Sequence, residues 1–94
     1  MEYNAKYGIL KLDVGDTTRL RLVGIERVPI NKWNFDTKVT VCMEDGTVCA
    51  LNCGYDIRTK LGGSNQGRWF SISRLEPHYS RQGGNNYHIK WEDP

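Results

Sequence analysis

The feature that most constrains the fold is an alternation of apolar and polar residues with period two. In the first part of the chain its apolar members are Leu10, Leu12, Val14, Leu20 and Leu22. Such alternation is typical of β-strands with one buried and one exposed face. Gly24 interrupts the pattern, which resumes at Ile25 and Val28, and a glycine within a strand often marks a bulge or bend. The pattern predicts a strand that bends at Gly24 and serves two parts of a small barrel.

Two further strands are predicted at residues 38–43 and 47–51. They are joined through Asp45-Gly46, a dipeptide that is a strong hairpin signal between alternating segments. The residues expected to point inward are Val39, Val41, Val48 and Ala50. The opposite face is expected to carry Lys38, Thr40, Cys42, Cys49 and Leu51.

One short helix is predicted after this hairpin. Asn52 can cap its start, Ile57 and Leu61 lie four residues apart on one face, and Gly62 stands where a left-handed C-terminal cap belongs. Two closing strands follow at residues 69–75 and 87–91. Their alternation assigns to the core Phe70, Ile72, Tyr87, Ile89 and Trp91.

Length and composition indicate a single domain over residues 1–94 that folds alone. No apolar run approaches the roughly 20 residues needed to cross a bilayer, and the first residues lack the layout of a signal peptide. We therefore expect a cytoplasmic protein without a membrane partner. A phage protein that acts in the cytoplasm of its host fits this expectation.

The charge distribution says more than the net charge of +2. Residues 19–38 hold five Lys and Arg against two acidic residues, and residues 58–90 hold six against one. The remainder of the chain is acidic. A fold that joins the two basic blocks would have a basic and an acidic side.

Metal binding and catalysis find little support in the sequence. Cys42, Cys49 and Cys53 form no C-x-x-C pair, so buried free thiols are favoured over a zinc site completed by a histidine. His78 and His88 have no nucleophile or carboxylate at a recognisable spacing. We expect no enzyme activity, no metal and no cofactor.

The predicted order is a bent strand, a loop at residues 29–36, a hairpin, a helix and two closing strands. This order resembles the OB-fold, an all-β, five-stranded Greek-key barrel with one short helix between strands three and four, which binds oligonucleotides and oligosaccharides. Residues 15–24 resemble the opening strand of small phage and archaeal single-stranded-DNA-binding proteins, and residues 68–74 with 87–90 resemble their closing strands. The long acidic tail by which many bacterial members recruit partners has no counterpart in the residues 92–94 that follow the last strand.

Candidate nucleic-acid-binding residues come from three parts of the chain. On the outward faces of the first two barrel strands they are Arg19, Arg21 and Lys38, with Arg27 beyond the bend. In the loop at residues 29–36 they are Lys32, Trp33 and Phe35. The rings of Trp33 and Phe35 either stack on bases or plug the barrel end. In the closing segment they are Tyr79 and Arg81 from the loop, and Trp69, which is either a stacking platform or a subunit contact.

These residues favour binding of single-stranded DNA, or RNA, with little sequence preference, because aromatic faces stack on any base while cations meet phosphates. Such a protein would act in replication, recombination or repair. The alternative is a protein-interaction barrel, OB or SH3-like, whose exposed aromatic residues contact another protein. The sequence also leaves a homo-oligomer open.

Overall fold

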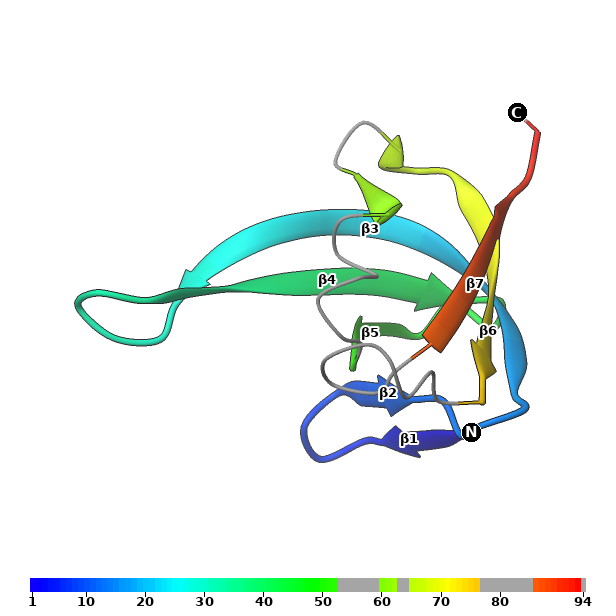
Figure 1. The fold of residues 1–94 in the computed structure, drawn as a ribbon, viewed down its shortest axis with the longest axis horizontal. Helices are drawn as coiled ribbons and strands as arrows, with labels where there is room; N and C mark the ends of the chain where they lie inside the picture. Colours follow the sequence, from blue (N-terminus) through cyan, green and yellow to red (C-terminus); the bar gives the residue numbers. More distant parts are fainter. Residues whose placement is uncertain (53–59, 63–64, 77–85, 94) are drawn as a thin grey trace.

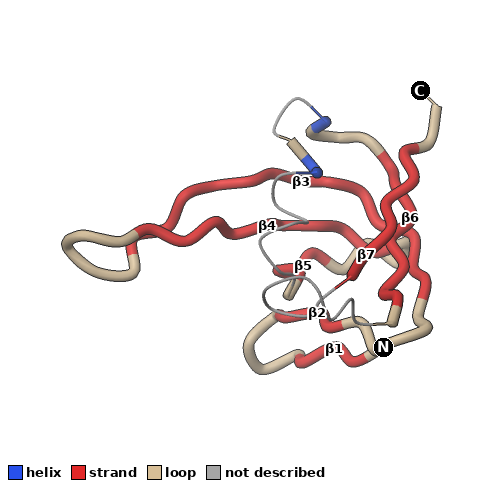
Figure 2. Tube along the Cα trace, viewed as in Figure 1, coloured by secondary structure: helices blue, strands red, loops and turns tan. Residues whose placement is uncertain are grey.

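The computed structural model describes residues 1–52, 60–62, 65–76 and 86–93. This part of the chain contains seven strands. The strands are β1 (Glu2–Asn4), β2 (Ile9–Lys11), β3 (Thr17–Pro29), β4 (Phe35–Met43), β5 (Val48–Leu51), β6 (Trp69–Leu75) and β7 (Asn86–Trp91). They form one sheet in the order β1-β2-β5-β4-β3-β6-β7 (Figures 1 and 2).

The prediction of a mainly β protein is confirmed. Within the described residues the sheet is not closed into a barrel, because β1 and β7 lie at its two edges. Most of the predicted helix, including Ile57, falls outside the described residues; Lys60 and Leu61 are helical, and Gly62 has the positive φ of 61° expected of a C-terminal cap. The five-stranded barrel and its helix therefore stay predictions.

The predicted bend of the long strand is present in β3. Its pairing with β4 shifts register between Leu22 and Gly24, and its pairing with β6 covers only Thr17 to Arg21. One strand thus pairs with β6 over its first residues, Thr17 to Arg21, and with β4 from Leu20 to Pro29. Beyond the bulge β3 still packs against the core through Ile25 and then leaves the body of the protein.

The core lies on one face of the sheet. It consists of Leu10, Leu12, Leu20, Leu22, Val39, Val41, Cys49, Leu51, Leu61, Phe70, Ile72 and Tyr87. Ile89 and Trp91 pack against it, and the Trp91 ring lies 5.1 Å from that of Phe70. The predicted core positions of β3, β4, β6 and β7 are confirmed.

The predicted facing of β5 is wrong. Val48 is 57% exposed, whereas Cys49 and Leu51 are buried. The turn decides the register, because Met43 and Thr47 close it and Val41 then lies directly opposite Cys49. Directly opposite residues share a face, so the odd-numbered residues of β5 point inward.

Sequence reasoning also missed where several strands begin and end. β1 was not anticipated, nor was the parallel pairing of β2 with β5. β2 falls within the predicted alternating run of Leu10, Leu12 and Val14, but the strand ends at Lys11. Residues 29–36 are not a loop throughout, because Pro29 ends β3, Phe35 begins β4 and these two residues pair. β3 and β4 therefore extend from the body as a two-stranded arm (Figure 1). The alternating pattern is lost there because most residues of the arm are exposed on both faces.

Candidate nucleic-acid interface

The outer face of the sheet, opposite the core, presents the first group of predicted residues. Arg19 and Arg21 are exposed while Leu20 and Leu22 are buried, so the predicted outward direction of both arginines is confirmed. Pairing places Trp69 of β6 directly beside Arg21.

The same pairing extends this group across three strands. Ser71 of β6 lies between Arg19 of β3 and Lys90 of β7. We call the outer-face group Arg19, Arg21, Trp69 and Lys90 the basic band. Residues from both basic blocks of the sequence thus meet on one surface.

Arg19 is held in place from two sides. Its guanidinium lies over the Trp69 ring, 4.1 Å from the ring centroid. Its Nε donates to Oε2 of Glu92 at 2.8 Å, and its Nη1 lies 3.4 Å from Oε1 of Glu44. The hydrogen bond to Glu92 is the main cause of a raised Arg19 pKa. Arg19 therefore covers one face of the Trp69 ring and is itself neutralised by carboxylates.

Arg21 differs from Arg19 in having its charge available. It is exposed, and no ion pair or hydrogen bond joins its side chain to another described residue. Lys90 is also exposed. Arg21 and Lys90 are therefore the cations of the basic band that can meet a phosphate without first losing a carboxylate partner.

Arg27 does not join this group. The bulge changes the alternation of β3, so Arg27 shares a face with Ile25, which packs against the core, and not with Arg21. A regular strand would have kept Arg21 and Arg27 on the same face. The bulge thus gives the chain two arginines on one strand that face opposite ways.

The tip of the arm presents Lys32 and Trp33. Trp33 is 80% exposed, so it does not plug the end of a barrel, and the ammonium of Lys32 lies 5.3 Å from its ring centroid. The Asn31 carboxamide oxygen accepts hydrogen bonds from the backbone amides of Trp33 and Asn34, both at 2.9 Å. This side-chain turn fixes the backbone on which the exposed indole stands. The side chain of Phe35 and the whole of Tyr79 and Arg81 lie outside the described residues.

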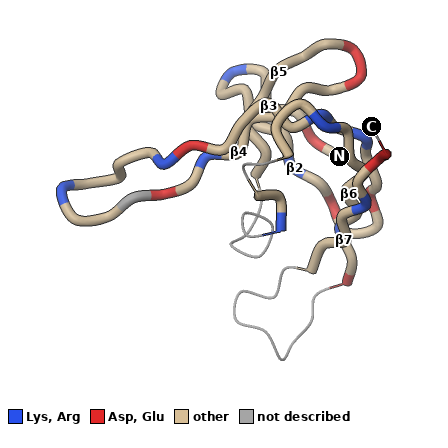
Figure 3. Tube along the Cα trace, turned by 90° about the horizontal axis from the view of Figure 1, so that it is seen from above, with Lys and Arg blue, Asp and Glu red and all other residues tan. Residues whose placement is uncertain are grey.

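Lys38 lies on the outer face of the arm among acidic side chains. Its partner on β3 is Glu26, and Asp36 precedes it by two residues on the same face. Basic and acidic residues therefore alternate along the arm (Figure 3). This face is close to neutral, unlike the basic band.

Most described cations of the second basic block serve the fold. Lys60 donates to a carbonyl of β7 at 3.3 Å. Arg68 Nη2 donates to the carbonyl of Glu92 at 3.1 Å, and Arg74 Nη1 to that of Leu12 at 2.7 Å. These three cations add to the positive charge of the block, but their donors bind backbone carbonyls rather than facing a ligand. Sequence alone carries no signal that separates the two uses.

Cys42 and Cys49 are buried free thiols on opposite faces of their strands. Burial is the main cause of the raised pKa of Cys49. Among the residues that the structure describes, no group of histidine, cysteine and carboxylate side chains could hold a metal ion.

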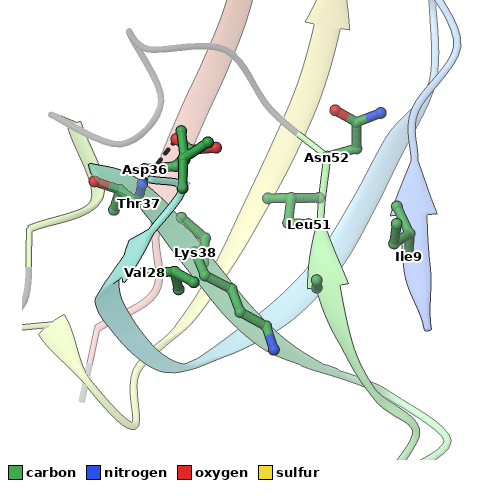
Figure 4. A pocket seen from close by; sticks show the side chains of 10 residues that line it. Ile9, Val28, Asp36, Thr37, Lys38, Leu51 and Asn52 are labelled. Atoms are coloured by element: carbon green, nitrogen blue, oxygen red, sulfur yellow. Dashed lines mark hydrogen bonds between the residues drawn. The ribbon is translucent and has the colours of Figure 1, made fainter. Parts of the chain in front are cut away.

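A groove of about 480 Å³ lies where β4 runs past the end of β5 (Figure 4). Asp36, Thr37 and Lys38 form one side, and Leu51, Asn52 and Ile9 form the other. Its remaining lining residues are Val28, Ile30, Val39 and Ala50. The groove adjoins the arm and shares no residue with the basic band.

Comparison with known proteins identifies no relative: no family model matches the chain, and neither a curated protein nor a solved structure is significantly similar to it. Among the described residues, no helix has the length and apolar character to span a bilayer.

Proposed function

We propose that this protein binds single-stranded DNA or RNA with little sequence preference, through the basic band on the outer face of its sheet. The observation that carries the proposal is the pairing of exposed, unneutralised Arg21 with Trp69 on the neighbouring strand. An aromatic ring can stack on any base, and an arginine beside it meets the phosphate of the same nucleotide.

The fold we infer is a variant of the OB-fold built from β3 to β7. Support comes from β3, which lies between β4 and β6 and bends at its bulge. The two hairpin pairs, β4 with β5 and β6 with β7, then lie on either side of it. In this fold family the face of strands 2 and 3, here β4 and β5, and the loops 1-2 and 4-5 receive oligonucleotides. The arm tip corresponds to loop 1-2, whereas the basic band lies on β3, β6 and β7.

A single strand fits the charge pattern better than a duplex does. The cations of the basic band are few and lie close together, while the adjoining arm carries Glu26 and Asp36 on the same face. A duplex backbone would need a longer continuous positive surface. A strand of a few nucleotides can follow the band alone and reach the arm tip only through its bases.

Trp33 supplies a second place for a base to stack. It stands at the fixed turn of the arm tip with the Lys32 ammonium beside it. A base on this ring would contribute about 1 to 3 kcal/mol. The proposal therefore assigns phosphate binding and one stacking contact to the band, and a second stacking contact to the tip.

The test is a titration with oligo-dT and with a duplex of equal length at two ionic strengths, followed by tryptophan fluorescence. We expect oligo-dT to quench the fluorescence and its affinity to fall steeply with salt. Absence of oligo-dT binding at low salt would refute the proposal. Tighter binding of the duplex would replace it with a role on double-stranded DNA.

Trp33→Ala separates the two contacts in that titration. We expect roughly a five- to hundredfold loss of affinity, the equivalent of one stacked base, with the salt dependence unchanged. Tyr7→Ala is the matched control, because Tyr7 is also exposed beside a lysine but lies on the turn between β1 and β2. Equal affinity of the parent and Trp33→Ala would remove the tip from the site.

A second candidate function is contact with another protein through the arm tip. It is favoured by the presence of Ile30, 64% exposed, beside the exposed Trp33, because large apolar residues gathered on a projection often mark such contacts. If the parent protein does not bind oligo-dT although its arm is folded, this becomes the leading function.

A further inference from the structure

The groove beside the arm is an opening onto the core. The pairing of β5 with β4 stops at Thr40, whereas β4 continues to Phe35. Val39 and Leu51 belong to the core, and both also line the groove. The end of β5 therefore leaves two core side chains on the wall of a surface groove.

Three further apolar side chains continue this surface toward the arm tip. Ile9 and Val28 are each 38% exposed, Ile30 is 64% exposed, and all three line the groove. Large apolar side chains that gather at one exposed site often mark a contact with another molecule. Their exposed fractions show that the described residues leave this surface partly uncovered.

The groove has the length of an extended peptide. One end lies at Ala50, which pairs with Thr40. The other lies at Ile30, whose amide donates to the carbonyl of Asn34 at 3.0 Å. An extended chain rises about 3.3 Å per residue, so the stretch from Asn34 to Thr40 spans about 20 Å. A volume of about 480 Å³ along this length describes a narrow groove that fits one extended chain.

The polar groups of the groove leave one positive charge open. The carboxylate of Asp36 is engaged, because its Oδ1 accepts the amide of Thr37 at 2.8 Å. Lys38 lies on the same side of the groove and Asn52 on the other (Figure 4). No hydrogen bond or ion pair joins either of these two side chains to another described residue. Apolar walls with a few polar groups are typical of a binding site.

The charges around Lys38 fit a ligand with a single negative charge. Glu26 lies directly opposite Lys38 on β3, and Asp36 lies two residues away on the same face. A run of phosphates would meet both carboxylates, whereas one carboxylate can approach the Lys38 ammonium alone. The groove therefore favours an acidic residue of a peptide over a nucleic-acid strand.

We propose that this groove binds an extended segment of a partner protein that carries several apolar side chains and one carboxylate. The apolar side chains cover Ile9, Val28 and Leu51. The carboxylate pairs with the Lys38 ammonium, and the Asn52 carboxamide hydrogen-bonds to a peptide group of the segment.

This inference does not depend on nucleic-acid binding. The residues of the basic band lie outside the groove, so a peptide and a single strand can be bound at the same time. Peptide titrations test the groove, and the oligo-dT titration tests the function. Substitutions in the groove should leave the affinity for oligo-dT at its parent value.

The probes are three pools of short peptides with blocked ends. In the first pool a central Glu is flanked by positions that hold an equimolar mixture of Leu, Ile, Val and Phe. The second pool has Gln in place of Glu, and the third has Ser at the apolar positions. Binding is followed by nuclear magnetic resonance of the isotope-labelled protein. We expect the Glu pool to shift the amide signals of Lys38, Ala50 and Leu51 and to leave those of Arg21 and Trp69 unchanged, and the Ser pool to shift none of them.

Lys38→Gln tests the charge. We expect its affinity for the Glu pool to fall by about three- to fivefold, the equivalent of one partly exposed ion pair, and its affinity for the Gln pool to stay unchanged. Lys32→Gln is the control, because it removes the same charge from the arm at a residue outside the groove. We expect it to leave both affinities unchanged.

Val28→Ser tests the apolar surface. We expect about five- to tenfold weaker binding of both the Glu pool and the Gln pool, because the contact loses apolar area. Val48→Ser is the matched control, since Val48 is 57% exposed on a strand and lies outside the groove. We expect it to bind both pools as the parent does.

Circular dichroism of each variant shows whether a loss of binding reflects unfolding. Absence of shifts at the groove with the Glu pool at millimolar concentration would overturn the proposal. So would a Lys38→Gln variant that loses equal affinity for the Glu and Gln pools, or equal losses in Val28→Ser and Val48→Ser.

Discussion

The two halves of the β3–β4 pair differ sharply although they belong to the same two strands. In the body, Leu20, Leu22 and Val41 are fully buried and define one face of the core. In the arm beyond the bulge, Val28 is partly exposed and Trp33 is 80% exposed. Beyond the Ile25–Val39 pair, which still packs in the core, regular pairing continues to Pro29 and Phe35 without a core to cover.

The difference shows that the residues of the arm are not explained by packing. A two-stranded hairpin is marginally stable in water by itself, so the arm depends on the body that its strands share. Its outward residues are available for a ligand or for another chain. The body provides the buried core that stabilises the fold, and the arm provides exposed side chains. The following substitutions test this difference.

The largest expected effect is in the body. Phe70→Ala removes a fully buried ring that contacts Trp91, and we expect a loss of about 3 to 5 kcal/mol in the free energy of unfolding. Chemical denaturation followed by circular dichroism measures it. Trp33→Ala in the arm should change the same quantity by less than about 0.5 kcal/mol. Similar losses in both variants would erase the distinction between body and arm.

A smaller effect is expected at the turn that sets the register of β5. Gly46 has a φ of 92°, and an added Cβ would meet no atom within 4 Å. Gly46→Ala therefore costs only backbone strain, about 1 to 2 kcal/mol in the free energy of unfolding. Gly24→Ala is the comparison, because Gly24 has no positive φ and equally open space. An equal cost at both positions would count against the positive φ of Gly46 as the cause.

Removal of the carboxylate that holds Arg19 should strengthen binding. Glu92→Gln leaves Arg19 over Trp69 and removes the shorter of its two ion pairs while that with Glu44 remains, so we expect the affinity for oligo-dT to rise by about two- to fivefold at low salt. Asp93→Asn removes the same charge from the neighbouring residue, which makes no ion pair with Arg19. A rise of equal size in both variants would indicate a general effect of net charge.

The smallest change in stability is expected at the arm tip. Asn31→Ala removes the acceptor for the amides of Trp33 and Asn34. The free energy of unfolding should change by less than about 0.5 kcal/mol, while these two amides exchange with solvent faster. Unchanged exchange would mean that the turn is held by other contacts.

Period-two alternation predicted the inward faces of β3, β4, β6 and β7, because burial on one face leaves a direct trace in the sequence. It failed at β5, where Cys49 and Leu51 took the core positions and the geometry of the turn decided the register. It gave no sign of β1, whose three residues are too few for a pattern, and it placed Leu10 of β2 in an alternating run that extends beyond the end of that strand at Lys11.

The candidate site was predicted only in part. The direction of Arg19 and Arg21 followed from their leucine neighbours, but the opposite direction of Arg27 required the position of the bulge. The carboxylates on Arg19 and the backbone roles of Arg68 and Arg74 depend on contacts between distant segments. Composition and spacing carry no information about such contacts.

Comparison of Arg21 with Arg27 tests the central claim most directly, because one strand presents them on opposite faces. The measurement is the slope of log affinity for oligo-dT against log salt concentration in Arg21→Gln and in Arg27→Gln. We expect Arg21→Gln to reduce the magnitude of the slope by about 0.7, the value for one lost phosphate contact to a single strand, and Arg27→Gln to leave it unchanged. Equal slopes in the two variants, or a reduction in Arg27→Gln alone, would contradict the assignment of the nucleic-acid interface to the basic band.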